Sequence, residues 1–175
     1  NKAAMEQRIN EILEFVELTD RADDKSRRYS GGMKRRLMIG MALLHKPKML
    51  FLDEPTVGLD PQVRRKMWDL IRKMNEAGMT VLLTTHYIEE ADQLCRRVAI
   101  MNRGRIIAVD TPQKLKEKVG RVVVEHMEAD GMINNFFDNR EQAASYVAGL
   151  NSNATVREAN LEDVFIELTG RRVND

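Results

Sequence analysis

A short apolar run that ends in two carboxylates constrains this chain more than any other feature of its sequence. Residues 49–52 read Met-Leu-Phe-Leu, and Asp53 and Glu54 follow directly. The run is too short for a helix and has no polar alternation, so it predicts a buried strand of a parallel sheet. Ligands of such sheets gather at the carboxyl ends of the strands. Many phosphate-handling α/β enzymes use acids at this place to hold Mg²⁺ and activate water.

The remaining sequence alternates between helical and strand-like segments, which predicts an α/β fold with a mostly parallel sheet and flanking helices. Predicted helices lie at residues 4–18, 33–44, 61–77, 87–95, 111–120, 140–150 and 161–168. Predicted strands lie at residues 49–52, 80–85, 98–101, 106–109, 122–124 and 155–158, with a polar loop at 19–29 and a hairpin turn at 102–105.

The pattern changes after Gly120, where the segments become short and less regular. We therefore expect two domains: residues 1–120, and a small α+β appendage at residues 121–175. A chain of 175 residues is long enough for one core plus such an appendage. A helix behind Asn160 as the cap would close the appendage.

Composition excludes several classes of protein. The formal net charge is +1, which gives no general case for binding nucleic acid or an anionic membrane. Cys95 is the single cysteine, so a disulfide framework is excluded and a reducing cytoplasm fits. No apolar stretch approaches the ~20 residues that span a bilayer.

Asp53 and Glu54 are neighbours, so their side chains diverge and we expect them to have different roles. Asp53 would hold Mg²⁺, directly or through a water. Glu54 would act as a general base on the attacking water, which is typically worth ~10² to 10⁴ in rate. The alternative is a strand end that merely meets solvent. The apolar residues before the pair and Pro-Thr-x-Gly-Leu-Asp after it favour the functional interpretation.

The tripeptide Ser30-Gly31-Gly32 stands where a predicted helix begins. Free amides and the helix dipole make such a place an anion site, and glycine lets a phosphate approach the backbone. The alternative is an ordinary Ser cap followed by a flexible Gly pair. The basic residues 34–36 could add positive potential near a phosphate. We instead expect them to form a solvated helix face, opposite an apolar side made by Leu37, Met38 and Met41.

His86 follows the predicted strand at residues 80–85. A histidine there can hydrogen-bond a γ-phosphate and report its presence, while the alternative is a capping or exposed side chain. We assign His45 and His126 to structure. The three histidines and Cys95 lack any spacing typical of a zinc site.

These motifs, in this order, closely resemble the later part of an ABC ATPase domain. Residues 29–33 resemble the signature motif, 48–54 the Walker B strand with its catalytic glutamate, 57–60 the D-loop, and His86 the switch histidine. By this resemblance Glu54 and His86 are catalytic and Asp53 binds the metal. The cofactors are ATP and Mg²⁺, and the implied nucleotide-binding residues are Ser30, Gly31, Gly32, Met33 and Asp60.

The resemblance is strongest to the ATP-binding subunits of bacterial drug, antibiotic or polysaccharide exporters. Tyr29, Met33 and the phrases at residues 84–91 and 161–170 point to this subfamily. It implies a P-loop-NTPase-like fold and a homodimer paired head to tail, with each ATP sandwiched between two domains. Hydrolysis would power a transmembrane permease. The protein would then be cytoplasmic and peripheral, held through the permease on the inner face of the cell membrane.

No glycine in the chain precedes a lysine, so the phosphate loop Gly-x-x-x-x-Gly-Lys-[Ser/Thr] is absent from these residues. We expect that loop and a Gln-bearing loop upstream of Asn1. The chain would then be a C-terminal fragment that binds ATP poorly and is inactive alone.

Two alternatives to an exporter subunit stay open. The chain could be a non-catalytic truncated fragment that only interacts or dimerises. It could also be a non-transport ABC ATPase acting on ribosomes or DNA, against which the charge of +1 and the lack of sustained heptads count. The appendage at residues 121–175 would serve dimerisation or regulation.

Overall fold

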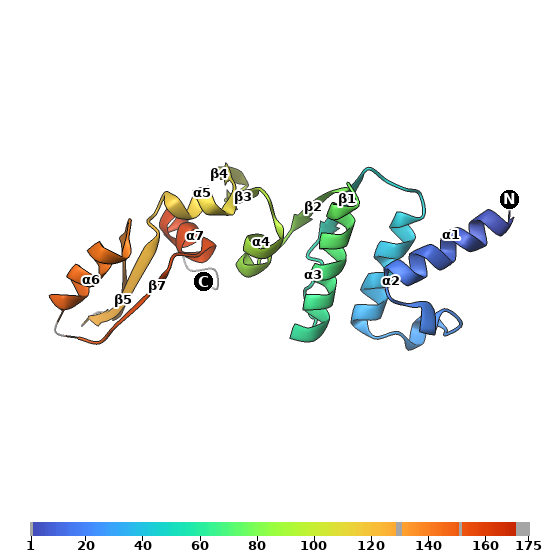
Figure 1. The fold of residues 1–175 in the computed structure, drawn as a ribbon, viewed down its shortest axis with the longest axis horizontal. Coiled ribbons are helices and arrows are strands. Elements are labelled where there is room, and N and C mark those ends of the chain that lie inside the picture. The colour runs from blue at the N-terminus through green and yellow to red at the C-terminus, as the bar shows by residue number, and fades with distance from the viewer. Residues whose placement is uncertain (1, 129–130, 151, 171–175) are drawn as a thin grey trace. The chain divides into compact units, whose positions relative to one another are not determined.

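The computed structural model describes residues 2–128, 131–150 and 152–170 and divides into two compact units, Asn1–His86 and Tyr87–Asp175 (Figure 1). The parts of the predicted domains at residues 1, 129–130, 151 and 171–175 lie outside the described residues. The two units meet between His86 and Tyr87, not near residue 120. The predicted domain boundary near residue 120 stays a prediction. Each unit is described by itself.

The first unit contains three helices and two strands in its described part, and the predicted elements are confirmed to within a few residues. They are α1 (Lys2–Phe15), α2 (Gly31–Leu43), β1 (Met49–Asp53), α3 (Pro61–Glu76) and β2 (Thr80–Thr84). Two 3₁₀ turns, Thr19–Arg21 and Ser26–Arg28, lie in the predicted loop. The α/β fold that the alternation predicts is thus present.

Strands β1 and β2 pair in parallel, with Asp53 opposite Thr84. Side chains alternate between the two faces of this pair, and one face is open: Phe51 is 68% exposed and Leu82 51% exposed. The prediction that residues 49–52 are buried throughout is therefore wrong for every second residue. Leu50 and Leu52 are half-buried on the opposite face.

Helix α2 packs through small residues. The position of a Cβ on Gly40 would lie 3.0 Å from Ile12 Cγ2, so α1 and α2 approach closely there. A Cβ on Gly32 would lie 2.3 Å from Val63 Cγ1 in α3. The buried stripe of α2 consequently runs along its glycines. The predicted apolar side is wrong, because Met38 and Met41 are exposed.

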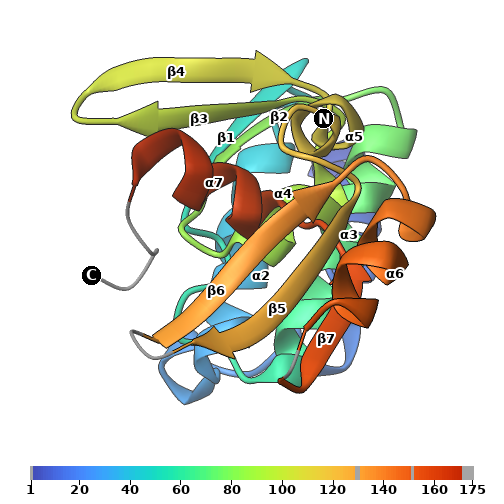
Figure 2. The same ribbon diagram turned by 90° about the vertical axis from the view of Figure 1, so that its left-hand side faces the viewer.

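The second unit contains the remaining elements (Figure 2). They are α4 (Ile88–Leu94), β3 (Val98–Asn102), β4 (Arg105–Asp110), α5 (Pro112–Glu117), β5 (Val122–Glu128), β6 (Gly131–Phe137), α6 (Arg140–Ala148), β7 (Ala154–Glu158) and α7 (Leu161–Thr169). The β3–β4 hairpin turns at Arg103 and Gly104, whose φ values of 48° and 74° match the turn that the sequence predicts. Strand β6 is an addition to the predicted elements.

Strands β6, β5 and β7 form an antiparallel sheet in that order. Helix α6 covers one face, where Val122, Val124 and Ala143 are buried together. His126 is buried on the same face, and its Nε2 lies 3.1 Å from the Tyr146 hydroxyl and 3.0 Å from Asn135 Nδ2. This environment agrees with the structural assignment of His126.

Helix α7 packs on elements that precede residue 120. Leu161 and Val164 share a buried cluster with Ile100 of β3 and Leu115 of α5. The last helix of the predicted appendage is therefore integrated into the core of the second unit.

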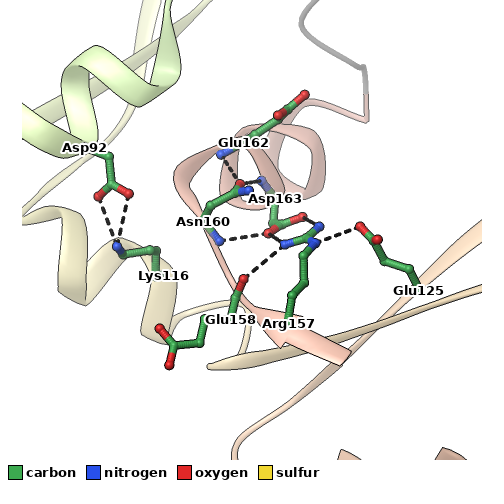
Figure 3. Close-up of polar contacts among 8 residues, drawn as sticks. All are labelled: Asp92, Lys116, Glu125, Arg157, Glu158, Asn160, Glu162 and Asp163. Carbon is green, nitrogen blue, oxygen red and sulfur yellow. Dashed lines mark hydrogen bonds and ion pairs between the residues drawn. The ribbon is translucent and has the colours of Figure 1, made fainter. Parts of the chain in front are cut away.

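A partly buried ionic network joins the start of α7 to the sheet (Figure 3). The Nη1 and Nη2 atoms of Arg157 each donate to Asp163 at 2.7 Å, and Nε donates to Glu125 at 2.7 Å. Asp163 is only 2% exposed and also accepts from the Asn160 amide at 2.8 Å. The hydrogen bonds to Asp163, with Glu125 adding to them, raise the pKa of the Arg157 guanidinium above its ordinary value.

Replacing Gly32 tests the close contact between α2 and α3. Because Val63 is stiff at χ1, the Gly32→Ala change should force a helix shift and lower the free energy of unfolding by about 1 to 3 kcal/mol. Gly31→Ala is the matched control, since its Cβ would meet nothing within 4 Å. In urea titrations, the loss in free energy of unfolding caused by Gly32→Ala should be smaller in a Val63→Ala background. Equal effects at the two glycines would contradict the contact.

Removing Arg157 tests the ionic network. The Arg157→Met variant leaves the Asp163 carboxylate buried without its counter-ion, so its free energy of unfolding should fall by about 2 to 4 kcal/mol. The control is Arg140→Met, which breaks the exposed Arg140–Glu158 pair and should cost less than about 1 kcal/mol. Similar losses in urea titrations of the two variants would show that the network adds nothing beyond surface charge.

Candidate functional site

The carboxyl ends of β1 and β2 bring four polar residues together. The parallel register places Asp53 beside Thr84, whose Oγ1 donates a hydrogen bond to Asp53 Oδ1. The Glu54 amide donates to both oxygens of Thr84, at 3.1 Å to the carbonyl and 3.3 Å to Oγ1. His86 follows two residues after Thr84. The sequence predicts this meeting of strand ends, and the structure has it.

Glu54 and His86 form a direct pair. The Nδ1 atom of His86 lies 2.9 Å from Glu54 Oε2, and the His86 amide donates to the same oxygen at 3.4 Å. The His86 side chain is 56% exposed and that of Glu54 34% exposed, so the pair is open to solvent on one side. Sequence reasoning assigned each residue a role but missed their contact, because it depends on the path of the chain after β2.

The backbone of Glu54 adopts an uncommon conformation. Its φ is 46°, in the left-handed region that costs a residue with a Cβ roughly 1 to 2 kcal/mol. Such conformations persist where the surroundings over-determine them. Here Thr84 receives the Glu54 amide hydrogen, and Arg35 Nη2 donates to the Glu54 carbonyl at 3.3 Å.

The prediction that the basic residues of α2 form a solvated face is wrong for its two arginines. Arg35 reaches the Glu54 carbonyl, and Arg36 Nη1 donates to the carbonyls of Val16 and Glu17 at 3.0 Å and 3.1 Å. A signal for Arg36 exists in the sequence, because it lies at helical spacing between Gly32 and the buried end of α2. No comparable signal marks Arg35.

The Ser30-Gly31-Gly32 tripeptide forms the start of α2. Ser30 Oγ accepts from the Met33 amide at 3.3 Å, which makes it the N-cap. Gly31 is exposed, with open space where a Cβ would be, whereas Gly32 is buried. The amides of a first helical turn lack intrahelical partners, so this end of α2 fits an anion above Gly31.

Asp60 is likewise a cap. Its Oδ1 accepts from the amides of Gln62 and Val63 at 3.0 Å each, and Pro61 begins α3. Asp60 therefore has a structural role as the cap of α3, whereas the sequence predicts only a role in nucleotide binding.

The Asp53 carboxylate is suited to bind a Mg²⁺ ion whose other ligands include phosphate oxygens. Asp53 is exposed at the strand end, and its carboxylate is a hard oxygen ligand. Within the described part of the chain, no group of three or more His, Cys, Asp or Glu residues could hold a metal ion by itself. Mg²⁺ usually keeps several waters and takes one or two carboxylates together with phosphate oxygens, and Asp53 can supply one such carboxylate.

None of the helices in the described residues has the length and apolar character needed to cross a membrane.

Comparison with known proteins agrees with the motifs. The family model for ABC transporters matches residues 1–57. The linearmycin resistance ATP-binding protein LnrL of Bacillus subtilis (strain 168) is 38% identical over 200 residues, covering 96% of this chain. The Nod factor export ATP-binding protein I of Burkholderia thailandensis is 42% identical over 185 residues, covering 94% of this chain. The chain spans 64% and 61% of the lengths of these two relatives.

Solved structures give the same result. An ATP-binding cassette of an ABC transporter, MJ1267 in its ADP conformation, aligns with a TM-score of 0.60 at 29% identity, covering 63% of this chain and 44% of that one. CbiO1 of Clostridium perfringens, part of the ABC transporter complex CbiONQ, aligns with a TM-score of 0.62 at 31% identity, covering 66% of this chain and 46% of that one. The relatives of this chain in sequence and in structure are thus ATP-binding subunits and cassettes of ABC transporters.

Proposed function

We propose that this chain belongs to the ATP-binding and ATP-hydrolysing subunit of a bacterial ABC exporter. The observation that carries the proposal is the pairing of Glu54 with His86 beside Asp53, at the end of a parallel strand pair. The group combines a carboxylate exposed for a metal ion with a second carboxylate held by an imidazole. The names of the relatives support an export function.

Within this site, Asp53 would hold Mg²⁺, which supplies neutralisation of phosphate charge when bound. Glu54 would take a proton from the attacking water. Both bonds to His86 use Oε2, so we assign Oε1 to the water. His86 would orient Glu54 and donate to the γ-phosphate.

The remaining motif residues would serve ATP across an interface. In this proposal Ser30, Gly31, Gly32, Met33 and Asp60 face the nucleotide held by a second copy of the subunit, in a head-to-tail homodimer. Open space at Gly31 supports a phosphate there. Hydrolysis would drive a transmembrane permease, which selects the exported molecule and holds the subunit at the cytoplasmic face of the membrane.

Replacing Glu54 by glutamine tests the general base. In the full-length protein, Glu54→Gln should lower kcat for ATP hydrolysis by about 10² to 10⁴, because the amide cannot accept the proton from water. Binding of a non-hydrolysable ATP analogue should persist. The control is Glu76→Gln, at an exposed position of α3, which should keep full activity. Wild-type hydrolysis by Glu54→Gln would refute the proposed chemistry.

Replacing Asp53 tests the metal ligand. The Asp53→Asn change removes the charge but keeps an oxygen that can accept from Thr84, so the strand pair should stay intact. Because Mg²⁺ favours carboxylate ligands, half-maximal hydrolysis should require about ten times more Mg²⁺. The measurement is a Mg²⁺ titration at fixed ATP, with Asp69→Asn on the exposed face of α3 as control. An unchanged Mg²⁺ requirement would remove Asp53 from the metal site.

A further inference from the structure

We infer that Arg35 is a positioning residue that holds Glu54 in the conformation required of the general base. The inference rests on the proposed function and adds a residue that the motif comparison does not assign. Its basis is the hydrogen bond from Arg35 Nη2 to the Glu54 carbonyl, at 3.3 Å, between residues 19 positions apart.

The first argument is the conformation of Glu54. With φ at 46°, its peptide needs partners on both sides to stay in the left-handed region. The amide side is bonded to Thr84 of β2. Arg35 supplies the bond on the carbonyl side, and it comes from a different element, α2. Rotation about φ of Glu54 moves its carbonyl and its side chain together, so a bonded carbonyl also limits the directions that the side chain can take. In the proposed mechanism this side chain points at the reacting water.

The second argument is the rigidity of the element that carries Arg35. Ser30 caps α2, Gly32 lies against Val63, and Gly40 lies against Ile12. The next residue, Arg36, is tied by its guanidinium to carbonyls after α1. Arg35 therefore stands on a helix that is braced on both sides. A positioning group needs this property, because a displacement of ~1 Å at a catalytic centre can cost ~10²-fold in rate.

The third argument is what lies at the start of the same helix. Ser30-Gly31-Gly32 forms the first turn of α2, and Arg35 lies just over one turn further on. A phosphate seated on the first turn would therefore bind to the same braced helix that carries Arg35. The bond to Glu54 thus joins the anion-binding end of α2 to the catalytic carboxylate.

Three variants of the full-length protein test the inference. Arg35→Met removes the donors and keeps most of the aliphatic stem, Arg35→Lys keeps one donor, and Lys34→Met is the exposed neighbour on the same helix. We expect Arg35→Met to lower kcat by about 10- to 100-fold. KM for ATP and the affinity for a non-hydrolysable analogue should stay unchanged. Arg35→Lys should recover part of kcat, and Lys34→Met should keep all of it.

A merely structural contact would give a different result. It would lower Tm and analogue affinity together with kcat, or leave kcat at the wild-type value, and either outcome overturns the inference. If Arg35→Met does not fold, Arg35→Lys decides: reduced kcat at unchanged analogue affinity supports positioning, and wild-type kcat overturns it. Wild-type hydrolysis by Glu54→Gln overturns the proposed function and this inference together. An inactive Glu54→Gln beside a fully active Arg35→Met overturns the inference alone.

Discussion

The parallel pairing of β1 with β2 is the interaction on which the candidate site depends. It places Asp53 opposite Thr84, so that one threonine hydroxyl can serve both the Asp53 carboxylate and the Glu54 amide. The same register brings the segment after β2 close enough for His86 to reach Glu54. A slip of one residue would exchange the faces of all side chains on one strand and separate these partners. The strand register thus decides which side chains meet at this end of the sheet.

The contrast between Asp53 and Glu54 shows how adjacent carboxylates acquire different surroundings. Asp53 is the last residue of the extended strand and bonds sideways to the neighbouring strand. Glu54 leaves the strand in a left-handed conformation, which turns its side chain toward His86. The prediction that their side chains diverge assumed that both residues lie in one pleated strand. The strand ends at Asp53, so Glu54 lies outside it. The turn at Glu54 therefore gives the two carboxylates their different surroundings.

Most of the helix and turn boundaries could be predicted from the sequence because they depend on interactions between residues close together in the chain. Pro61 after Asp60, Asn160 before α7 and Gly104 in the hairpin turn each place a boundary through a short-range bond or a backbone preference. Strand β6 was not predicted because Asn134 and Asn135 interrupt its apolar residues and weaken the local preference for a strand. The segment forms a strand because it pairs with β5.

Contacts between residues far apart in the sequence could not be predicted for a different reason. The bond between Arg35 and Glu54 joins residues whose distance depends on how α2 packs, and that packing follows glycines instead of the methionines that dominate its apolar pattern. A helical pattern identifies a face by its residue types, but close approach requires the absence of side chains. For the candidate site, the strand-end acids and His86 were therefore accessible to sequence reasoning, whereas the residue that braces Glu54 was not.

The caps of α2 and α3 show that structural and functional interpretations of a residue need not compete. Ser30 Oγ accepts a hydrogen bond from the Met33 amide, and a hydroxyl that accepts can still donate its own hydrogen to a phosphate oxygen. Asp60 uses Oδ1 for two amides of α3, and its carboxylate has a second oxygen. In the proposed dimer, the bonds that begin these helices would also orient the groups offered to the partner's nucleotide. Capping then supplies the preorganisation that a binding residue needs, because the side chain is already ordered before the ligand arrives.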